Sequence, residues 1–294
     1  MRVLVTGGAG FIGSNVADRL LELGHRVTVM DDLSTGFAEN LNPKADFLRM
    51  DIRSPEAAEA VRDGGFDAIC HHAAQMDVRR SVREPVFDSS VNIGGTLNLL
   101  EAARVSGVKR IVYASTGGAV YGEPEYVPVR EDHPVNPICH YGVSKHTVEH
   151  YLFLYRRLYG VGYVVLRYPN VYGPRQNPGG EAGVTAIFTV KYLRGTPPRI
   201  NGDGEQLRDY VHVRDIAEAN VLALDPTRPE LDGGVQHRVG RRQKRQRAGP
   251  DNQGLRGERP GPGVRPSPAG GDSKGQPRCL PGPGDSRVEA HHPL

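Results

Sequence analysis

The sequence lacks the features of membrane-spanning, secreted and zinc-binding chains. No run of eighteen apolar residues occurs in its 294 residues, so we expect no membrane-spanning helix. Its three cysteines form neither a CxxC pair nor a zinc-site spacing, and we expect no metal. The opening MRVLVTGG indicates a strand and a glycine turn instead of a signal peptide, so we expect a reducing cytoplasm.

The net charge of +3 is unevenly distributed along the chain. Residues 236–294 hold twelve Lys or Arg and five Asp or Glu, a balance of +7, which leaves about −4 for residues 1–235. Because a run of basic residues is usually just exposed to solvent, we expect no nucleic-acid binding. The same segment contains no Ile, Phe, Tyr, Trp or Met, and Gly and Pro make up 20 of its 59 residues. This composition predicts a disordered tail.

Before the tail, short β-branched runs alternate with longer amphipathic stretches. This alternation predicts an α/β fold, in which a parallel sheet carries helices on both faces. We expect strands at residues 2–6, 26–30, 68–72, 110–115 and 162–168. We expect helices at residues 11–23, 55–63, 85–106 and 140–159.

A glycine-rich segment joins the first strand to the first helix. Gly7 allows a tight turn, Gly10 lets the backbone approach a pyrophosphate, and Gly13 lets helix and strand pack closely. Phe11 and Ile12 open the helix, whose free N–H groups favour an anion. The pattern predicts a doubly wound, Rossmann-like dinucleotide-binding domain. We place this domain at residues 1–170, a small and incomplete substrate lobe at 171–235, and the tail at 236–294.

Two acidic residues follow strands of this domain. Asp31 ends the second strand, where its carboxylate can accept both ribose hydroxyls and would repel a 2′-phosphate. The cofactor is therefore expected to be NAD instead of NADP. Asp51 and Ile52 follow a third short strand and would flank the adenine.

Four side chains are candidates for catalysis. Tyr141 and Lys145 are four residues apart on a predicted helix and so share a face. A nearby ammonium favours the phenolate and lowers the pKa of the tyrosine, which makes Tyr141 a candidate general base. Ser115 and Thr116 end the fifth strand, and ligands bind at the carboxyl ends of strands in such sheets.

Seven motifs occur in order over residues 1–235: TGGAGFIG, HHAAQ, NIGGT, ASTGGAVYGE, YGVSK, RYPNVYGPRQ and GEQLRDYVHVRD. With them the chain resembles the extended short-chain dehydrogenase/reductase family, and within it the 4-epimerases that interconvert UDP-glucose and UDP-galactose. The resemblance implies that hydride passes from sugar C4 to NAD, that the 4-keto intermediate turns over, and that hydride returns to its opposite face. It also implies a UDP-sugar partner and a homodimer through the helices at 85–106 and 140–159.

The resemblance also implies roles for individual residues. Tyr141 would take the proton of the sugar hydroxyl, Lys145 would bind the nicotinamide ribose, and Thr116 or Ser115 would bond the same sugar oxygen. The family's usual hydroxyl aligns one residue later, at Gly117. Further contacts would come from two sets of residues: Asn170 and Arg208 on the substrate diphosphate, and His72, Ala73, Ala74, Gln75, Asn92 and Tyr168 on the cofactor. For His71 and His72, an ordinary role at a strand end is the alternative.

Three other functions stay open. A sugar-nucleotide 4,6-dehydratase shares the fold and the Tyr–Lys pair, but it needs an acidic pair where Gly117 and Gly118 stand here. Another UDP-sugar epimerase or a decarboxylase is compatible with a sugar pocket that the sequence marks poorly. A catalytically silent NAD-binding module is the third alternative, because the C-terminal segment departs from the family.

The tail has a specific explanation, a one-base shift of reading frame near Val235. Read one base later, the codons for residues 236–240 permit Asn-Ile-Gly-Ser-Gly. This matches the sequence that follows at this point in the family that the chain resembles. The same offset permits Leu-Thr-Ile-Lys over 250–253 and Arg-Pro-Gly-Glu over 268–271, in the order expected of the family. On this hypothesis the tail forms no cooperative structure. The alternative is a native disordered tail rich in Gly, Pro and Arg.

Overall fold

The structure, a computed structural model, describes residues 1–179, 183–200, 204, 207–225, 227–228, 231, 233, 235–237, 241–244 and 263–264. Of the predicted tail it describes only residues 236–237, 241–244 and 263–264, and all of these lie in short strands. The rest of the disorder prediction falls outside the described residues. Among the helices that are described, none is long and apolar enough to cross a bilayer.

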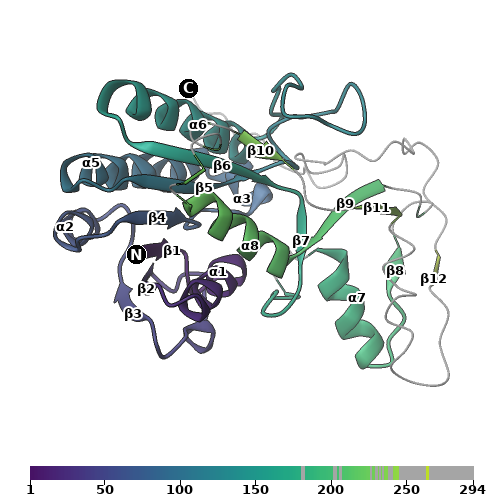
Figure 1. The fold of residues 1–294 in the computed structure, drawn as a ribbon. Coiled ribbons are helices and arrows are strands. Elements are labelled where there is room, and N and C mark those ends of the chain that lie inside the picture. The colour runs from purple at the N-terminus through teal and green to yellow at the C-terminus, as the bar shows by residue number, and fades with distance from the viewer. Residues whose placement is uncertain are drawn as a thin grey trace, which may run out of the picture.

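A seven-stranded parallel sheet forms the centre of the molecule (Figure 1). Its order is β10-β6-β5-β4-β1-β2-β3. The strands are β1 (Arg2–Thr6), β2 (Arg26–Asp31), β3 (Asp46–Arg49), β4 (Ala68–His71), β5 (Arg110–Thr116), β6 (Gly162–Tyr168) and β10 (Val235–His237). From β1 the chain adds β2 and β3 on one side. It then returns and adds β4, β5, β6 and β10 on the other side of β1. This change of direction between β1 and β4 is the point where open α/β sheets bind ligands.

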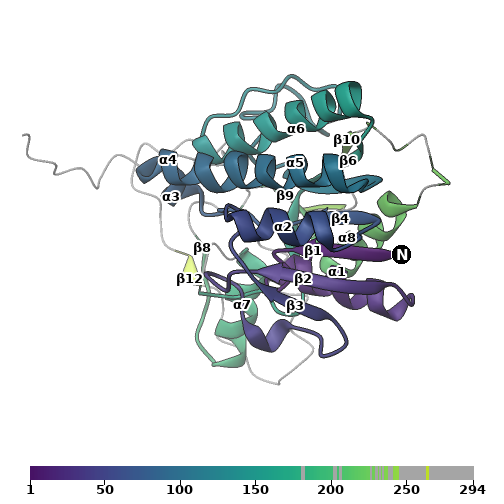
Figure 2. The ribbon, with the colours of Figure 1, turned by 90° about the vertical axis from the view of Figure 1, so that its left-hand side faces the viewer.

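Helices cover both faces of the sheet, so its strands are apolar on both sides. On one face lie α2 (Pro55–Asp63), α5 (Thr96–Ser106) and α6 (His140–Tyr159), which Figure 2 shows side by side. On the other lie α1 (Phe11–Glu22) and α8 (Val213–Leu224). Within β1, Leu4 packs into the first layer, whereas Val3 and Val5 pack into the second. The predicted α/β class and doubly wound sheet are confirmed.

The helix predicted at 85–106 is present but contains a change of helical type. It runs as α4 (Pro85–Ser89), a π-helical segment η2 (Ser90–Gly95) and then α5. It ends at Gly107, which adopts the left-handed conformation with φ 79°. A π turn inserts one extra residue into the backbone ladder and often marks a functional site. Here it contains Asn92, one of the predicted cofactor residues.

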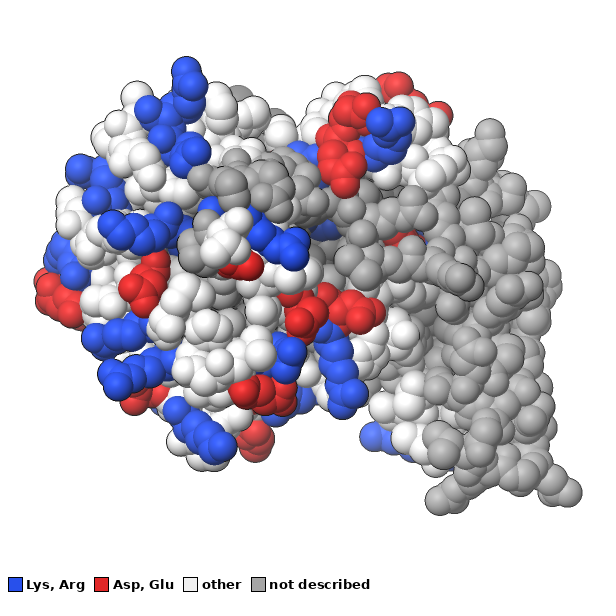
Figure 3. All heavy atoms as spheres, viewed as in Figure 1, with Lys and Arg blue, Asp and Glu red and all other residues white. Residues whose placement is uncertain are grey.

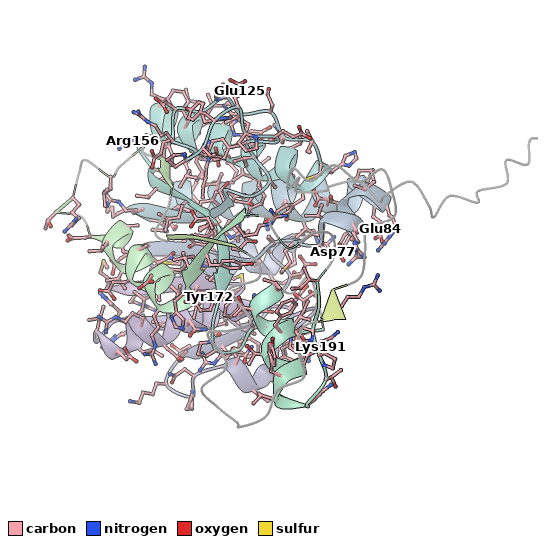
Figure 4. All side chains as sticks on the ribbon, turned by 90° about the vertical axis from the view of Figure 1, so that its right-hand side faces the viewer. Asp77, Glu84, Glu125, Arg156, Tyr172 and Lys191 are labelled. Atoms are coloured by element: carbon pink, nitrogen blue, oxygen red, sulfur yellow. The ribbon has the colours of Figure 1, made fainter. Side chains whose placement is uncertain are left out.

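A smaller lobe extends from the carboxyl edge of the large sheet. Its three-stranded sheet has the order β11-β9-β7, formed by β7 (Asn170–Tyr172), β9 (Leu207–His212) and β11 (Arg241–Lys244). The pair β8 (Arg199–Ile200) and β12 (Gly263–Val264) and the helix α7 (Val184–Leu193) complete it. Figure 4 shows this lobe with Tyr172 on β7 and Lys191 on α7 labelled. After β9 the chain returns to the large domain, where α8 packs against α1 and β10 joins β6, and it then goes back to the lobe with β11 and β12.

Candidate active site

The predicted site residues come together at the carboxyl edge of the large sheet. Five strands end there, and their last or next residues are Gly7 after β1, Asp31 of β2, His72 after β4, Thr116 of β5 and Tyr168 of β6. All five strands are parallel, so these residues lie at one edge of the sheet. The fold therefore brings these candidate residues together at one edge of the sheet.

The glycine turn after β1 leaves no room for side chains. Gly7 has φ 67°, and a Cβ atom there would lie 2.6 Å from the backbone nitrogen of Ala73. A Cβ atom on Gly13 would lie 2.3 Å from the carbonyl oxygen of Gly7. At Gly10 the nearest atom would be that same oxygen, at 3.1 Å. The turn is thus pressed between β4 and the start of α1, which only glycine allows.

This turn delivers the start of α1 to the edge of the sheet. Gly10 is the N-cap, and Phe11 and Ile12 are the first residues of the helix. The first N–H groups of a helix have no partner within it, and the helix dipole adds partial positive charge there. No acidic residue lies in the first turn of α1. The residues present therefore fit the pyrophosphate of a dinucleotide.

Asp31 lies against the same turn. Its carboxylate oxygens accept hydrogen bonds from the N–H of Ala9 at 3.0 Å and of Leu33 at 2.8 Å. The side chain is buried, and this burial raises its pKa, while the two backbone hydrogen bonds act in the opposite direction. A carboxylate oxygen has a further lone pair that can accept from a ribose hydroxyl. The arrangement fits an NAD ribose.

Asp51 and Ile52 lie next to Asp31, after β3. The N–H of Met50 donates to the carbonyl oxygen of Asp31 at 3.2 Å, which brings the two strand ends together. Ile52 is buried against the π-helical segment, where Gly95 leaves room for it. The carboxylate of Asp51 is paired with Arg53, whose hydrogen bonds lower its pKa. Asp51 is thus close to the predicted adenine position, but its charge is neutralised locally.

Gln75 and Asn92 hold the loop after β4 from inside. Gln75 accepts at Oε1 from the N–H of Asp77 and donates from Nε2 to the carboxylate of Asp88, at 2.7 and 2.9 Å. Asn92 accepts from the N–H of Gln75 at 2.8 Å and donates to Asp88 and to Ser144 on α6. Asp77 caps α3 (Val78–Arg83) and is labelled in Figure 4. Both amides serve as internal braces of the cofactor loop.

Ala73 and Ala74 form the backbone of the same loop. The N–H of Ala73 donates to the hydroxyl of Thr6 at 3.2 Å, so the loop is fixed to the end of β1. Both alanines are half-buried at the edge beside Gly7. Their small side chains leave this edge open to a ligand.

His71 ends β4 and is buried, and His72, the next residue, is half-buried. Thr96 donates its hydroxyl to the carbonyl oxygen of Asn92, so it must accept from Nε2–H of His71 at 2.9 Å. Nδ1 of His71 then accepts from the hydroxyl of Thr6 at 2.6 Å. Burial lowers the pKa of His71 to about 3 and that of His72 to about 4. Both histidines are therefore neutral, and His71 is a structural residue.

Tyr168 is held by a residue that sequence analysis did not identify. Its hydroxyl lies 3.2 Å from Nε2 of His72 and accepts from Nδ2 of Asn220 at 2.7 Å. Asn220 is buried on α8, more than fifty residues further along the chain. Its position is set by the packing of α8 on α1, which no local pattern indicates. The His72–Tyr168 pair thus fixes one side of the predicted cofactor site.

Tyr141 is the second residue of α6, and Lys145 follows one turn later. The backbone N–H of Tyr141 donates to the hydroxyl of Ser81 on α3 at 3.2 Å. Burial raises the pKa of Tyr141, and the carboxylate of Asp88 raises it further. Lys145 is 3 % exposed, and burial lowers its pKa to about 7. Its Nζ atom lies over the ring of Tyr113, 4.2 Å from the centroid.

The predicted lowering of the Tyr141 pKa by Lys145 is therefore not found in this geometry. Desolvation disfavours charge on both groups, and the ammonium faces Tyr113. The two residues nevertheless share one face of α6, next to the end of β5, as predicted.

Ser115 and Thr116 point in different directions. The hydroxyl of Ser115 is buried and donates to Oε1 of Glu149 on α6 at 2.6 Å. Glu149 also accepts from Arg167 on β6. Thr116 is half-buried, and its hydroxyl accepts from the N–H of Gly118 at 3.2 Å. The geometry favours Thr116 as the hydroxyl available to a substrate.

Asn170 and Arg208 lie on neighbouring strands of the smaller sheet. Asn170 pairs with Tyr210 in the parallel register of β7 and β9, and its Nδ2 donates to the carbonyl oxygen of Asp209 at 3.3 Å. Arg208 is two residues before Tyr210 on β9 and is half-buried. The fold therefore places both next to each other, beyond the end of β6.

Comparison with known proteins agrees with this geometry. A model of the NAD dependent epimerase/dehydratase family matches residues 3–235. A putative UDP-glucose 4-epimerase of Methanocaldococcus jannaschii is 52 % identical over 223 residues, which are 76 % of this chain and 73 % of the relative.

Two solved structures are similar throughout most of the fold. The UDP-glucose 4-epimerase of Thermotoga maritima with UDP-glucose has a TM-score of 0.85 and 45 % identity, over 92 % of this chain and 87 % of that one. The UDP-glucose 4-epimerase of Thermus thermophilus in complex with NAD has a TM-score of 0.82 and 45 % identity, over 91 % and 86 %.

Proposed function

This chain belongs to the NAD-dependent epimerase/dehydratase family, and we propose that it interconverts UDP-glucose and UDP-galactose by inverting sugar C4. The observation that carries the proposal is the placement of Tyr141, Lys145 and Thr116 beside a turn that fits NAD, at one edge of the sheet. UDP-glucose is the ligand of the similar Thermotoga maritima enzyme, and NAD is that of the Thermus thermophilus enzyme.

NAD would be held by Gly7, Gly10 and the start of α1 at its pyrophosphate and by Asp31 at its ribose. The proposed cofactor site is completed by Phe11, Ile12, Gly13, Asp51, Ile52, His72, Ala73, Ala74, Gln75, Asn92 and Tyr168. NAD supplies, when bound, a positively charged ring that accepts a hydride and can return it. The carboxylate of Asp31 would repel a 2′-phosphate, so we propose NAD in preference to NADP.

The protein's own residues handle the proton and the orientation of the sugar. The phenol oxygen of Tyr141 takes the proton of the sugar 4-hydroxyl and later gives it back, as a general base and then a general acid. Lys145 would bind the nicotinamide ribose, the role that the family resemblance implies for it. The hydroxyl of Thr116 donates to the same sugar oxygen, while Ser115 remains bound to Glu149.

The substrate diphosphate is assigned to Asn170 and Arg208. The guanidinium of Arg208 can bond two phosphate oxygens at once, and the amide of Asn170 can donate beside it. Holding the substrate by its nucleotide leaves the sugar free to present either face of C4 to the cofactor. This freedom is what inversion at C4 requires.

Two alternatives are less well supported by the site. A dehydratase would need a carboxylic acid beside Thr116, and the residues there are Gly117 and Gly118. A catalytically silent NAD-binding module would have no need of Tyr141 and Lys145 together on one face of α6.

We also propose a homodimer through α5 and α6, by analogy with the family.

The proposal is tested by the variant Tyr141→Phe. Turnover of UDP-glucose to UDP-galactose should fall by about 10² to 10⁴-fold, because only the proton acceptor is removed. Bound NAD, measured after denaturing the purified protein, should remain. The matched control is Tyr159→Phe, an exposed tyrosine at the other end of α6.

Near-normal turnover in Tyr141→Phe would show that Tyr141 is not the general base. An unmodified chain that retains NAD but turns over neither sugar would identify it as the silent module.

A further inference from the structure

A buried carboxylate beside the catalytic pair has no part in the chemistry described above. Asp88 on α4 is 1 % exposed. Its Oδ1 atom accepts from Nε2 of Gln75 at 2.9 Å and from Nδ2 of Asn92 at 3.2 Å. Both donors are neutral, and among the described residues no Lys, Arg or His forms an ion pair with Asp88. Buried charges are normally paired, so a carboxylate held by two amides is unusual.

Asp88 belongs to a closed ring of hydrogen bonds that passes through the backbone of Tyr141. On one side the ring runs through Asn92, whose Nδ2 atom lies 3.0 Å from the hydroxyl oxygen of Ser144. This hydroxyl donates to the carbonyl oxygen of Tyr141 at 3.1 Å, so it accepts from Asn92. One half of the ring thus fixes the carbonyl group of Tyr141.

The other half of the ring fixes the N–H group of Tyr141. Nε2 of Gln75 donates one hydrogen to Asp88 and the other to the carbonyl oxygen of Asp77, both at 2.9 Å. The same carbonyl oxygen accepts from the N–H of Ser81 at 3.0 Å. The hydroxyl oxygen of Ser81 then accepts from the N–H of Tyr141 at 3.2 Å. Asp88 is therefore connected to both backbone groups of the candidate base.

The side chains that carry the ring are all buried. Their exposed fractions are between 0 and 8 % for Gln75, Ser81, Asp88, Asn92 and Ser144. A buried donor or acceptor that loses its partner retains the cost of its desolvation, so the bonds hold as a set. Nδ2 of Asn92 has two hydrogens but faces a third acceptor, the carbonyl oxygen of Gln75 at 3.0 Å. An ionised acceptor makes the stronger bonds, so Asp88 anchors the ring.

The charge of Asp88 also acts on the catalytic pair. Burial is the main cause of the raised pKa of Tyr141, and the carboxylate of Asp88 raises it further. Burial lowers the pKa of Lys145 to about 7, while the carboxylates of Glu149 and Asp88 act to raise it. A negative charge has both effects because it disfavours the phenolate and favours the ammonium. The other titratable groups that face the pair are Tyr113 on β5, His71 and His72 at and after the end of β4, and Cys139 before α6.

We propose that Asp88 is a positioning residue for Tyr141, an inference that rests on the proposed function. Its buried carboxylate anchors the ring of hydrogen bonds that holds both backbone groups of Tyr141, and so fixes the direction from which the phenol reaches the sugar hydroxyl. A general base must lie within hydrogen-bond reach of the proton that it takes, so a small displacement of the first turn of α6 costs turnover. Asp88 acts through Tyr141 and is not itself a catalytic residue.

Two variants separate the hydrogen bonds of Asp88 from its charge. Asp88→Asn removes the charge but keeps one oxygen atom for both amide donors, since both bond Oδ1. Asp88→Ala removes the acceptor as well. The matched control is Glu84→Gln, which removes an exposed carboxylate four residues earlier that is paired with Arg80 and is labelled in Figure 4.

Hydrogen exchange of the Tyr141 amide, measured by NMR on the full chain, tests the ring without an assay of turnover. This amide lies in the first turn of α6 and has no partner within the helix, so its protection depends on Ser81. Exchange should be faster by about tenfold or more in Asp88→Ala. It should be about two- to fivefold faster in Asp88→Asn, because a neutral oxygen accepts more weakly. Glu84→Gln should exchange at the unmodified rate.

The Asn variant keeps this test decisive if Asp88→Ala does not fold. An unchanged exchange rate in Asp88→Asn, or in a folded Asp88→Ala, would overturn the proposal. If the unmodified chain turns over no sugar, the proposed function fails, while amide exchange still decides whether Asp88 holds Tyr141.

The pH dependence of turnover tests the charge. Without the carboxylate the pKa values of Tyr141 and Lys145 both fall, so the kcat profile of Asp88→Asn should move to lower pH by about 0.3 unit or more. The KM for UDP-glucose, assigned to Asn170 and Arg208, should change less than about twofold. A residue with a merely structural role would lower kcat at every pH without moving the profile, and that result would overturn the electrostatic part of the proposal.

Discussion

His71 links three parts of the cofactor edge through hydrogen bonds of fixed direction. It accepts from Thr6 at the end of β1 and donates to Thr96 at the start of α5, while Thr6 also receives the N–H of Ala73. The glycine turn, the loop after β4 and the π-helical segment are therefore held together by a neutral imidazole. A proton on Nδ1 would place a charge in a buried site.

This predicts a pH dependence of folding stability. The folded-state pKa values of His71 and His72, about 3 and about 4, lie below the ordinary value of 6.5. Between these limits the unfolded chain binds more protons, so the contribution of these two histidines to stability is complete above pH 6.5 and is lost as the pH falls towards 4. The free energy of unfolding should fall by up to about 1.4 kcal/mol per pH unit for each histidine.

Urea unfolding between pH 7.5 and pH 5 measures this dependence. His71→Gln should show a weaker slope than the unmodified chain, whereas the exposed His140→Gln should not. Equal slopes in all three proteins would contradict the prediction.

At the scale of single residues, the sequence predicted which residue types form the site better than it predicted the direction and the neighbours of their side chains. Ser115 and Thr116 were equivalent as two hydroxyls at a strand end, and only the pairing of Ser115 with Glu149 distinguishes them. The pKa of Tyr141 was predicted from one neighbour, Lys145, whereas burial and Asp88 determine it. Both results depend on residues that packing brings together from other elements.

At the level of elements, the start of α1 depends on the absence of a side chain at Gly13. A Cβ atom there would overlap the carbonyl oxygen of Gly7, which belongs to backbone and cannot rotate away. We predict that Gly13→Ala shifts the helix or the turn, costs about 1–3 kcal/mol of stability and removes most bound NAD. Urea unfolding and release of NAD measure the two effects.

Gly94→Ala provides the matched control for this variant. Gly94 lies in the helical run of 85–106, and a Cβ atom there would meet nothing closer than 4.0 Å. It should be neutral or slightly stabilising, because alanine is the better helix former. A Gly13→Ala protein with unchanged stability and NAD content would show that the turn tolerates the added atom.

The helices and strands of the first domain were predictable because their apolar periodicity is local. The helix at 140–159 has the predicted bounds, and the strand at 110–115 gains only Thr116. The π-helical segment was not predictable, because Asn92 is held by Gln75, Asp88 and Ser144 from three other places. The small sheet was not predictable for the same reason, since β7 and β9 are separated by more than thirty residues.

At the level of the whole molecule, the match to the family model ends where the composition changes. The family match stops at residue 235, and 27 % of the Methanocaldococcus jannaschii relative is left unmatched, that is 100 − 73. On the face in Figure 3, acidic and basic side chains of the described residues are interspersed. The basic balance of residues 236–294 is thus a property of that segment alone.

We therefore predict that the coding DNA contains a one-base shift near the codon for Val235. Read one base later, it should encode the family continuation, including Arg-Pro-Gly-Glu over the codons of 268–271. A chain continued in that frame should turn over UDP-glucose at least tenfold faster than the present one, while both bind NAD through residues 1–170. Sequencing of the DNA and the paired assay check this. A shifted frame with stop codons or no family motif would contradict it.

The predicted shift of reading frame falls at the first residue of β10. Val235–His237 pairs with β6 and forms the last strand of the large sheet. A lesion in the gene at this point spares every codon of α1 to α8 and preserves the opening residue of the edge strand. A nascent chain leaving the ribosome would already contain the other six strands of the sheet before the altered codons were translated. Mutations of this kind are thus more easily survived here than a few dozen codons upstream, where α8 and its contact with Tyr168 would be lost.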